Sequence, residues 1–109
     1  MIRAEFVIQD SKILSFSLEG HAGLAPAPHD VLCASVSAMA LLTVNTVTEI
    51  FGAKADLVIA EEKPLISMTL SHVPEENILA VEGVLRGLLL QLSDLEEQYP
   101  KHLKIRTKK

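Results

Sequence analysis

The stretch from Pro74 to Pro100 most narrows the folds open to this chain. Apolar residues recur there every three or four positions, the spacing that places them on one side of an α-helix. They are Ile78, Val81, Leu85, Leu88, Leu92, Leu95 and Tyr99. Pro74 fits the first helical position, where a missing N–H costs little, and Pro100 ends the helix. A helix with one long apolar stripe needs a second layer of structure to cover it.

A second helix is predicted from Asp30 to Phe51. Asp30 is a good N-cap, and Gly52 is a good residue just past the helix end. The apolar spacing predicts a buried face made of Val31, Ala34, Ala38, Leu41 and Leu42, followed by Val44, Val47 and Phe51.

Small residues on the two helices predict close contact between them. These residues are Ala34, Ala38, Gly83 and Gly87. Leu89 and Leu90 lie off the main stripe of the 74–100 helix, which indicates either a dimer contact or burial at the helix edge.

Five segments have the pattern of strands. Residues 2–9 and 12–19 flank the turn-like pair Asp10-Ser11 and predict a hairpin, with Leu14, Phe16 and Leu18 on the buried face. Residues 54–61 and 65–72 form a second pair around a turn at 61–64, and residues 101–107 form a last strand. The order is ββαββαβ. It predicts an α+β fold, a two-layer sandwich whose five-stranded sheet carries both helices on one face.

Composition limits the remaining possibilities. A chain of 109 residues predicts a single domain, 1–109, and 49% hydrophobic but 4% aromatic residues predict an aliphatic core. A net charge of −4 argues against general nucleic-acid binding. The basic residues 101–109 are then a solvated strand with a frayed end, or an electrostatic dock for an RNA-rich particle. A single cysteine favours a reducing, cytoplasmic compartment. From the sequence we expect no apolar run that approaches the roughly 18 residues of a membrane span.

Cys33 has the most reactive side chain in these segments. If Asp30 is the N-cap, Cys33 lies in the first helical turn, where the helix end favours a thiolate by about 0.3–1 kcal/mol. A full thiolate at neutral pH then needs a further cation. His21 follows Gly20 at a strand end. The loop of residues 22–29 is long enough to fold back and bring His21 to Cys33. His21 would act as general base and then acid, with first-turn N–H groups as oxyanion donors.

The residues alone leave simpler interpretations open. A lone cysteine in such a helix is more often an inert core residue, a histidine after a strand-ending glycine is more often a surface residue, and Asp30 serves first as an N-cap. Ser37 lies one turn after Cys33. Its hydroxyl either makes a hydrogen bond near the site or, as is commoner, donates to the backbone of its own helix. His21, His29 and Cys33 are also conceivable metal ligands, but their spacing matches no tight rule and no fourth ligand is evident.

Two short motifs contain these residues, 20-GHA-22 and 28-PHDVLCASVS-37. Together they resemble the hallmark of the bacterial ribosomal-processing cysteine proteases (Prp), which reads approximately G-H-A, a variable loop, then G-x-D-[IV]-V-C-A-[AG]-V-S. Asn45 stands where the family often has Asn in its first helix. Tyr99-Pro100 and 103-LKI-105 look like the family's closing Y-P and final strand, so the resemblance covers nearly the whole chain.

The resemblance implies a ββαββαβ sandwich, usually a homodimer, that acts as a cysteine endopeptidase. Its implied substrate partner is the short N-terminal leader of a large-subunit bacterial ribosomal protein in the cytoplasm. It implies Cys33 as nucleophile, His21 as general base and acid, and Asp30 and Ser37 as supporting residues. Neither a metal nor an organic cofactor is implied, and no direct nucleic-acid or membrane partner is expected. The alternative is a non-catalytic ribosome-associated binding protein that uses the basic tail.

The loop between the two motifs resembles a mobile lid over the site. Its residues here include Gly23, Leu24, Pro26, Pro28 and His29. Pro28 stands where the family has Gly, and Leu32 replaces the common Val. Because proline fixes φ and removes a donor, we expect a stiffer lid than a Gly-bearing one.

Overall fold

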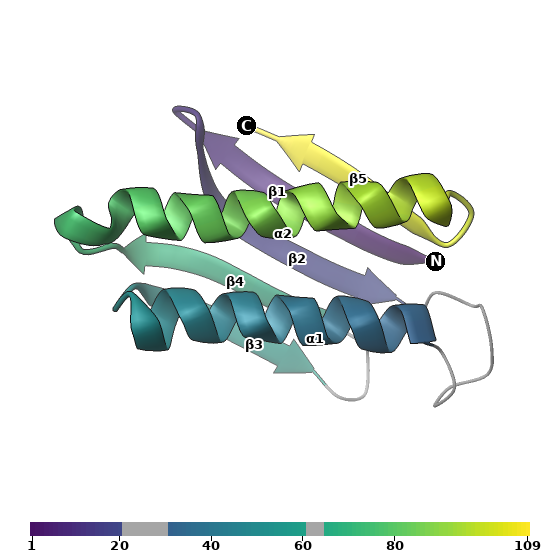
Figure 1. Ribbon diagram of the computed structural model, residues 1–109, viewed down its shortest axis with the longest axis horizontal. Helices are drawn as coiled ribbons and strands as arrows, with labels where there is room; N and C mark the ends of the chain where they lie inside the picture. The colour runs from purple at the N-terminus through teal and green to yellow at the C-terminus, as the bar shows by residue number, and fades with distance from the viewer. Residues whose placement is uncertain (21–30, 61–64) are drawn as a thin grey trace.

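The computed structural model describes residues 1–20, 31–60 and 65–109 (Figure 1). Its elements are β1 (Ile2–Gln9), β2 (Lys12–Gly20), α1 (Val31–Asn45), β3 (Lys54–Ala60), β4 (Leu65–His72), α2 (Ile78–Gln98) and β5 (Leu103–Lys108). A π-helical turn, Thr46–Ile50, extends α1, and a 3-10 turn, Glu75–Asn77, leads into α2. The predicted order is confirmed. The N-cap Asp30 and the turn at 61–64 lie outside the described residues.

The five strands form one sheet in the order β3-β4-β2-β1-β5. All neighbours are antiparallel except β1 and β5, which are parallel. Figure 1 shows both helices in front of the sheet, as the sequence predicts. At the β1–β2 turn Asp10 and Ser11 have φ values of 51° and 64°. Two successive positive φ values match the right-handed twist of a hairpin, so the predicted turn is present.

The predicted buried face of β2 is wrong at one residue. The pairing passes from Val7↔Ser15 to Ile8↔Ile13, which leaves Leu14 as an extra residue in a β-bulge. Ile13 is therefore buried at 2% exposure, whereas Leu14 is only half-buried. The Ile13 N–H donates to both carboxylate oxygens of Glu82, at 3.3 and 3.1 Å, and α2 thereby holds the bulge. Simple alternation cannot reveal an inserted residue.

The predicted buried face of α1 is wrong in its first part and correct at Val44 and Val47, which are buried. Its predicted residues Val31, Ala34, Ala38, Leu41 and Leu42 are all exposed. The face that packs on the sheet consists of Leu32, Val36, Ala40, Thr43 and Val44, continued by Val47 in the π-helical turn. The cause is that α1 is apolar on nearly every side, so its periodicity does not single out one face. The predicted end is correct, because Gly52 has φ +71° just past the turn.

The predicted small-residue contact between the helices is wrong as well. A Cβ added at Gly83 or Gly87 would meet nothing within 4 Å, and both glycines are exposed. Ala34 and Ala38 also face outward. The two helices instead meet over larger side chains of the shared core.

The apolar stripe of α2 is confirmed. Val81, Leu85, Leu88 and Leu92 are buried, and the remaining predicted positions are half-buried. Pro74 is not the first helical residue: its ψ of 136° is extended, and it precedes the 3-10 turn. Leu89 packs against the core, whereas Leu90 is 66% exposed.

The helix that runs from Val31 to Ile50 is long and apolar enough to cross a membrane, by length and composition. This contradicts the expectation that no such segment exists. Core helices of water-surrounded domains pass the same test, and this one places Leu32, Val36 and Ala40 in the core beneath it. One side of this helix therefore belongs to the protein core.

Candidate active site

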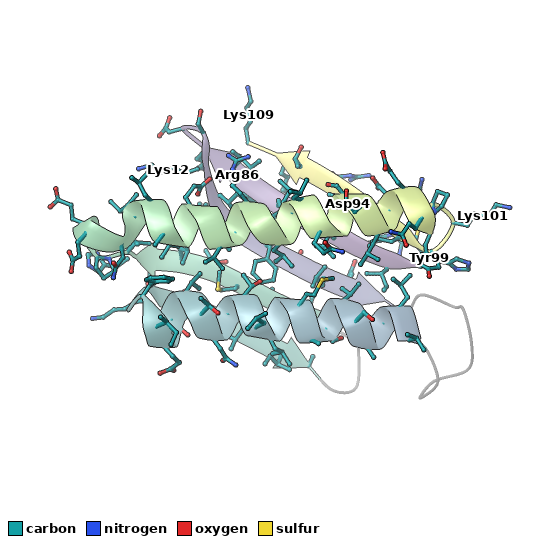
Figure 2. All side chains as sticks on the ribbon, in the orientation of Figure 1. Lys12, Arg86, Asp94, Tyr99, Lys101 and Lys109 are labelled. Atoms are coloured by element: carbon teal, nitrogen blue, oxygen red, sulfur yellow. The ribbon has the colours of Figure 1, made fainter. Side chains whose placement is uncertain are left out.

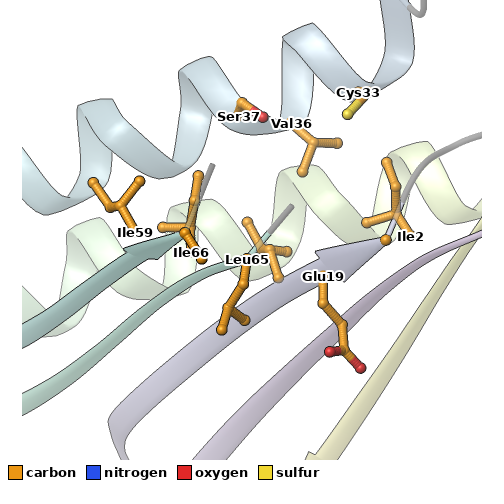
Figure 3. Close-up of a pocket in the computed structure, with 11 residues that line it drawn as sticks. Ile2, Glu19, Cys33, Val36, Ser37, Ile59, Leu65 and Ile66 are labelled. Carbon is orange, nitrogen blue, oxygen red and sulfur yellow. The ribbon is translucent and has the colours of Figure 1, made fainter. Parts of the chain in front are cut away.

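Cys33 is the third residue of α1 and is half-buried. It opens into a cleft of about 240 Å³ that lies between α1 and the ends of β2, β3 and β4 (Figure 3). The cleft wall is mainly apolar, with Val36 on the helix and Ile59, Leu65 and Ile66 on the strands. A peptide that enters this cleft can reach the thiol, and the first turn of an α-helix also has N–H groups without partners inside the helix.

Gly20 ends β2 at this cleft. Its φ is +94°, and a Cβ there would collide with the carbonyl oxygen of Met1, so only glycine fits. Gly20 and Cys33 line the same cleft. One described residue from each motif, Gly20 from the first and Cys33 from the second, therefore lies at the same cleft.

The structure places two of the predicted site residues in one wall. Ser37 lies one turn after Cys33, and both line the cleft (Figure 3). The remaining predicted site residues lie outside the described part of the chain. They are His21, Gly23, Leu24, Pro26, Pro28, His29 and Asp30.

The hydroxyl of Ser37 differs from every other helical hydroxyl that the structure describes. Ser35 and Thr43 in α1 and Ser93 in α2 each donate at 2.8 Å to the carbonyl oxygen four residues earlier. Thr46 and Thr48 in the π-helical turn do the same at 2.7 Å. Ser37 makes no such bond within the described residues. Its hydroxyl is therefore available to a molecule in the cleft.

The strand residues of the cleft were not predicted from the sequence. Ile59, Leu65 and Ile66 are far from Cys33 along the chain, and only the sheet order brings them to it. Glu19 is the one carboxylate among the described lining residues, and Figure 3 shows it directed away from Cys33. One signal was present in the sequence: Leu57, Val58 and Ile59 form an apolar run that the sheet alone does not bury.

A sequence model of the family described as cysteine protease Prp matches residues 1–104. The chain belongs to the Prp family. The ribosomal processing cysteine protease Prp of Bacillus subtilis (strain 168) is 31% identical over 100 residues, which cover 90% of this chain and 88% of that protein. The family assignment makes this chain a cysteine protease, and Cys33 is its only cysteine.

Solved structures confirm the Prp fold. The S. aureus ribosomal processing protease Prp, crystallised with a covalently linked product peptide, has a TM-score of 0.88 and 21% identity, covering 99% of this chain and 100% of that one. A Streptococcus mutans protein has a TM-score of 0.86 and 25% identity, covering 99% of this chain and 94% of that one. The S. aureus protease with a substrate peptide has a TM-score of 0.82 and 21% identity, with coverage of 99% and 100%.

Proposed function

We propose that this Prp protein is a cytoplasmic, single-domain endopeptidase that removes a short N-terminal leader from a large-subunit bacterial ribosomal protein. The observation that carries the proposal is the position of Cys33, which opens from the first turn of α1 into an apolar cleft. The name of the B. subtilis relative supports the ribosomal substrate. An apolar cleft suits an extended peptide that inserts alternate apolar side chains.

In the first half of the proposed reaction Cys33 is the nucleophile. Its sulfur attacks the carbonyl carbon of the scissile peptide bond, and His21 holds the thiol proton. The oxyanion accepts hydrogen bonds from N–H groups of the first α1 turn. His21 then gives the proton to the leaving amine, the C–N bond breaks, and the leader stays on Cys33 as a thioester.

In the second half a water molecule attacks the thioester carbonyl. His21 accepts a proton from this water, and the carbon–sulfur bond breaks. The leader leaves with a new carboxylate, and Cys33 is regenerated. Asp30 is assigned the role of orienting His21, and no metal or organic cofactor enters either half.

Ser37 is assigned a supporting role next to Cys33. Its hydroxyl lies in the same cleft wall and makes no bond to the helix backbone, unlike that of Ser35. We propose that it hydrogen-bonds the backbone of a bound peptide, which would fix the scissile carbonyl relative to the sulfur.

The protein is proposed to act as a homodimer that pairs through α1 and β3. Val31 and Leu42 of α1 are 73% and 67% exposed, and Leu57 and Ile59 of β3 are 44% and 54% exposed. In the described sheet β3 pairs only with β4, so its outer edge is open. A second copy related by a twofold axis would cover both the apolar helix side and the strand edge, since such an interface uses the same patch twice.

The direct test mixes the purified protein with the host's leader-bearing large-subunit ribosomal protein and measures product masses. We expect one cut that separates the leader from the mature protein, and no cut in a version made without the leader. Failure to cut the leader-bearing protein would refute the proposed substrate.

The role of His21 is tested by the rate at which iodoacetamide alkylates Cys33 as pH is varied. His21→Ala should shift the rise in alkylation to higher pH and remove most cleavage activity, because the partner that holds the thiol proton is gone. An unchanged rate profile would remove His21 from the mechanism. His72→Ala is the matched control, because it removes an exposed imidazole at the end of β4 rather than one from the signature.

The alternative function is a non-catalytic ribosome-associated binding protein. The basic residues near the C-terminus favour it. Under this alternative, deletion of residues 106–109 abolishes ribosome association while Cys33→Ala changes nothing in the cell. Under the protease proposal Cys33→Ala leaves the leader uncut.

A further inference from the structure

Charge is strongly segregated along this chain. Residues 1–100 carry five Lys or Arg and fourteen Asp or Glu side chains, whereas residues 101–109 carry five Lys or Arg and no acidic side chain. The overall charge of −4, which argued against nucleic-acid binding, therefore hides a concentrated cationic segment. A local positive patch can bind an anionic partner even on an acidic protein.

The strand geometry gathers these cations on one side of the sheet. Leu103 is buried and Ile105 packs against the core, so the alternating residues Lys104, Arg106 and Lys108 project from the face away from the helices. In the parallel register Arg3 of β1 pairs with Lys104. These four residues, Arg3, Lys104, Arg106 and Lys108, form what we call the β5 basic row, and all are exposed.

The β5 basic row stands on an ordered strand rather than on a frayed tail. β5 pairs with β1 over six residue pairs, from Ile2↔Leu103 to Val7↔Lys108. On the outer side of β5 the Ile105 N–H donates to Glu96 of α2 at 2.8 Å. Lys108 is held by Glu5 at 3.2 Å in a solvent-exposed ion pair. Figure 2 shows Lys101 and Lys109 projecting outward near the two ends of the strand.

Next to the row lies a shallow cleft of about 400 Å³. Arg3, Lys104 and Arg106 line it together with Ser17, Glu5 and Glu19. Most of its lining side chains are polar or charged and none of the described ones is aromatic, so the cleft offers contacts to charged groups and no surface for stacking bases.

We propose that the β5 basic row docks the protein on the phosphate backbone of RNA. Alternate strand residues on one face are about 6.6 Å apart, so the three β5 cations form a straight, evenly spaced line that suits a linear polyanion. RNA carries one such charge per nucleotide. A membrane partner is disfavoured because the cleft beside the row offers no aromatic side chain for the lipid interface. Glu5 and Glu19 would repel phosphates and carboxylates alike, so the polyglutamate arm of the test below distinguishes an acidic peptide from RNA.

The location of the β5 basic row fits the proposed function. The inference rests on that function, because a ribosomal substrate would bring the protein close to RNA. The Cys33 cleft opens on the helix side, beneath α1, whereas the row lies on the opposite face of the sheet. An RNA strand on that face leaves the cleft accessible. Because the substrate is a ribosomal protein, docking on RNA would raise the local concentration of substrate around the protease.

The test measures binding of fluorescent oligouridine and oligoadenosine, each of about 20 nucleotides, as salt concentration is varied. We expect the two RNAs to bind alike, since no side chain in the row reads bases, with a slope of log K against log salt of about −2 to −3. Lys104→Gln/Arg106→Gln should weaken binding about tenfold or more and reduce the slope by about 1.4. The matched control is Lys12→Gln/Lys54→Gln, which removes two exposed charges elsewhere and should change neither value.

Three outcomes would overturn the proposal: no RNA binding by the unaltered protein, equal weakening in the control variant, or binding to phosphatidylserine vesicles or polyglutamate but not to RNA. Cleavage of a short leader peptide separates this inference from the proposed function, because both double variants should cut that peptide at the unaltered rate. If no variant cuts it while the RNA results hold, the protease proposal fails and the docking proposal stands.

Discussion

The two helices pack on the same sheet but differ in what they leave outside. α2 buries one regular stripe and shows water a mostly polar side, interrupted by Leu79 and Leu90. α1 buries an equally apolar face and still exposes Val31 and Leu42. It also carries Cys33 and Ser37 at the cleft. α2 therefore mainly supports the core. α1 supports the core, carries the residues of the candidate site and, in our proposal, forms the dimer interface.

The largest effect is expected on the buried side of α2. Leu85→Ala should lower the free energy of unfolding by about 2–5 kcal/mol, because Leu85 is 0% exposed and its loss leaves a cavity. Urea denaturation monitored by circular dichroism measures this. Leu79→Ala, at an 87% exposed position of the same helix, should change stability by less than about 0.5 kcal/mol. Similar losses in the free energy of unfolding at both positions would show that α2 does not have the buried and exposed sides assigned to it.

The next effect concerns the exposed side of α1. Leu42→Asp should weaken the proposed homodimer about a hundredfold, because it places a charge in a desolvated apolar interface. Light scattering over a range of protein concentrations reports the dimer fraction. Leu90→Asp makes the same change at an equally exposed position of α2, 66% against 67%, and should leave association unchanged. A dimer lost in the Leu90 variant instead would move the interface to α2.

A smaller effect is expected where α2 holds the hairpin. Glu82 accepts the Ile13 N–H at the bulge and also pairs with Arg86 at 2.8 Å. Glu82→Ala should lower the free energy of unfolding by about 1–3 kcal/mol, because it leaves a partly buried donor unsatisfied. Glu97→Ala, an exposed change on the same helix, is the control. Equal unfolding midpoints for the two variants would show that the bulge does not depend on α2.

The smallest effect is expected at Ser37. Ser37→Ala should reduce kcat/KM for leader cleavage about tenfold, which corresponds to about 1.4 kcal/mol, with unchanged unfolding. Ser35→Ala removes a hydroxyl that only bonds the Val31 carbonyl oxygen, so it should cut at the unaltered rate. Peptide cleavage assays on both variants make the comparison. Equal cleavage rates for Ser37→Ala and the unaltered protein would show that Ser37 does not support catalysis.

The sequence predicts the fold well where one physical period dominates. The stripe of α2 and the order of the strands follow from 3.6- and 2-residue periods. The inner face of α1 does not follow, because its residues are apolar on nearly all sides. The bulge at Leu14 was hidden because one inserted residue leaves the local alternation intact on either side.

The candidate site shows the same division. The signature marks Cys33 and Ser37 because both are local to one helix, and the structure brings them into one wall. Ile59 and Leu65 could not be predicted as cleft residues, because their place in the cleft depends on the pairing of β3 with β4. The partnership of Cys33 with His21 stays a prediction, since His21 lies outside the described residues.

The most direct test of the central claim is leader cleavage by variants at Cys33. The account predicts that Cys33→Ala and Cys33→Ser release no leader from the ribosomal protein, as measured by product mass, while their circular dichroism and unfolding match the unaltered protein. The fold should survive because Cys33 is half-buried at a helix start rather than deep in the core. Cleavage of the same bond by Cys33→Ala would contradict the account.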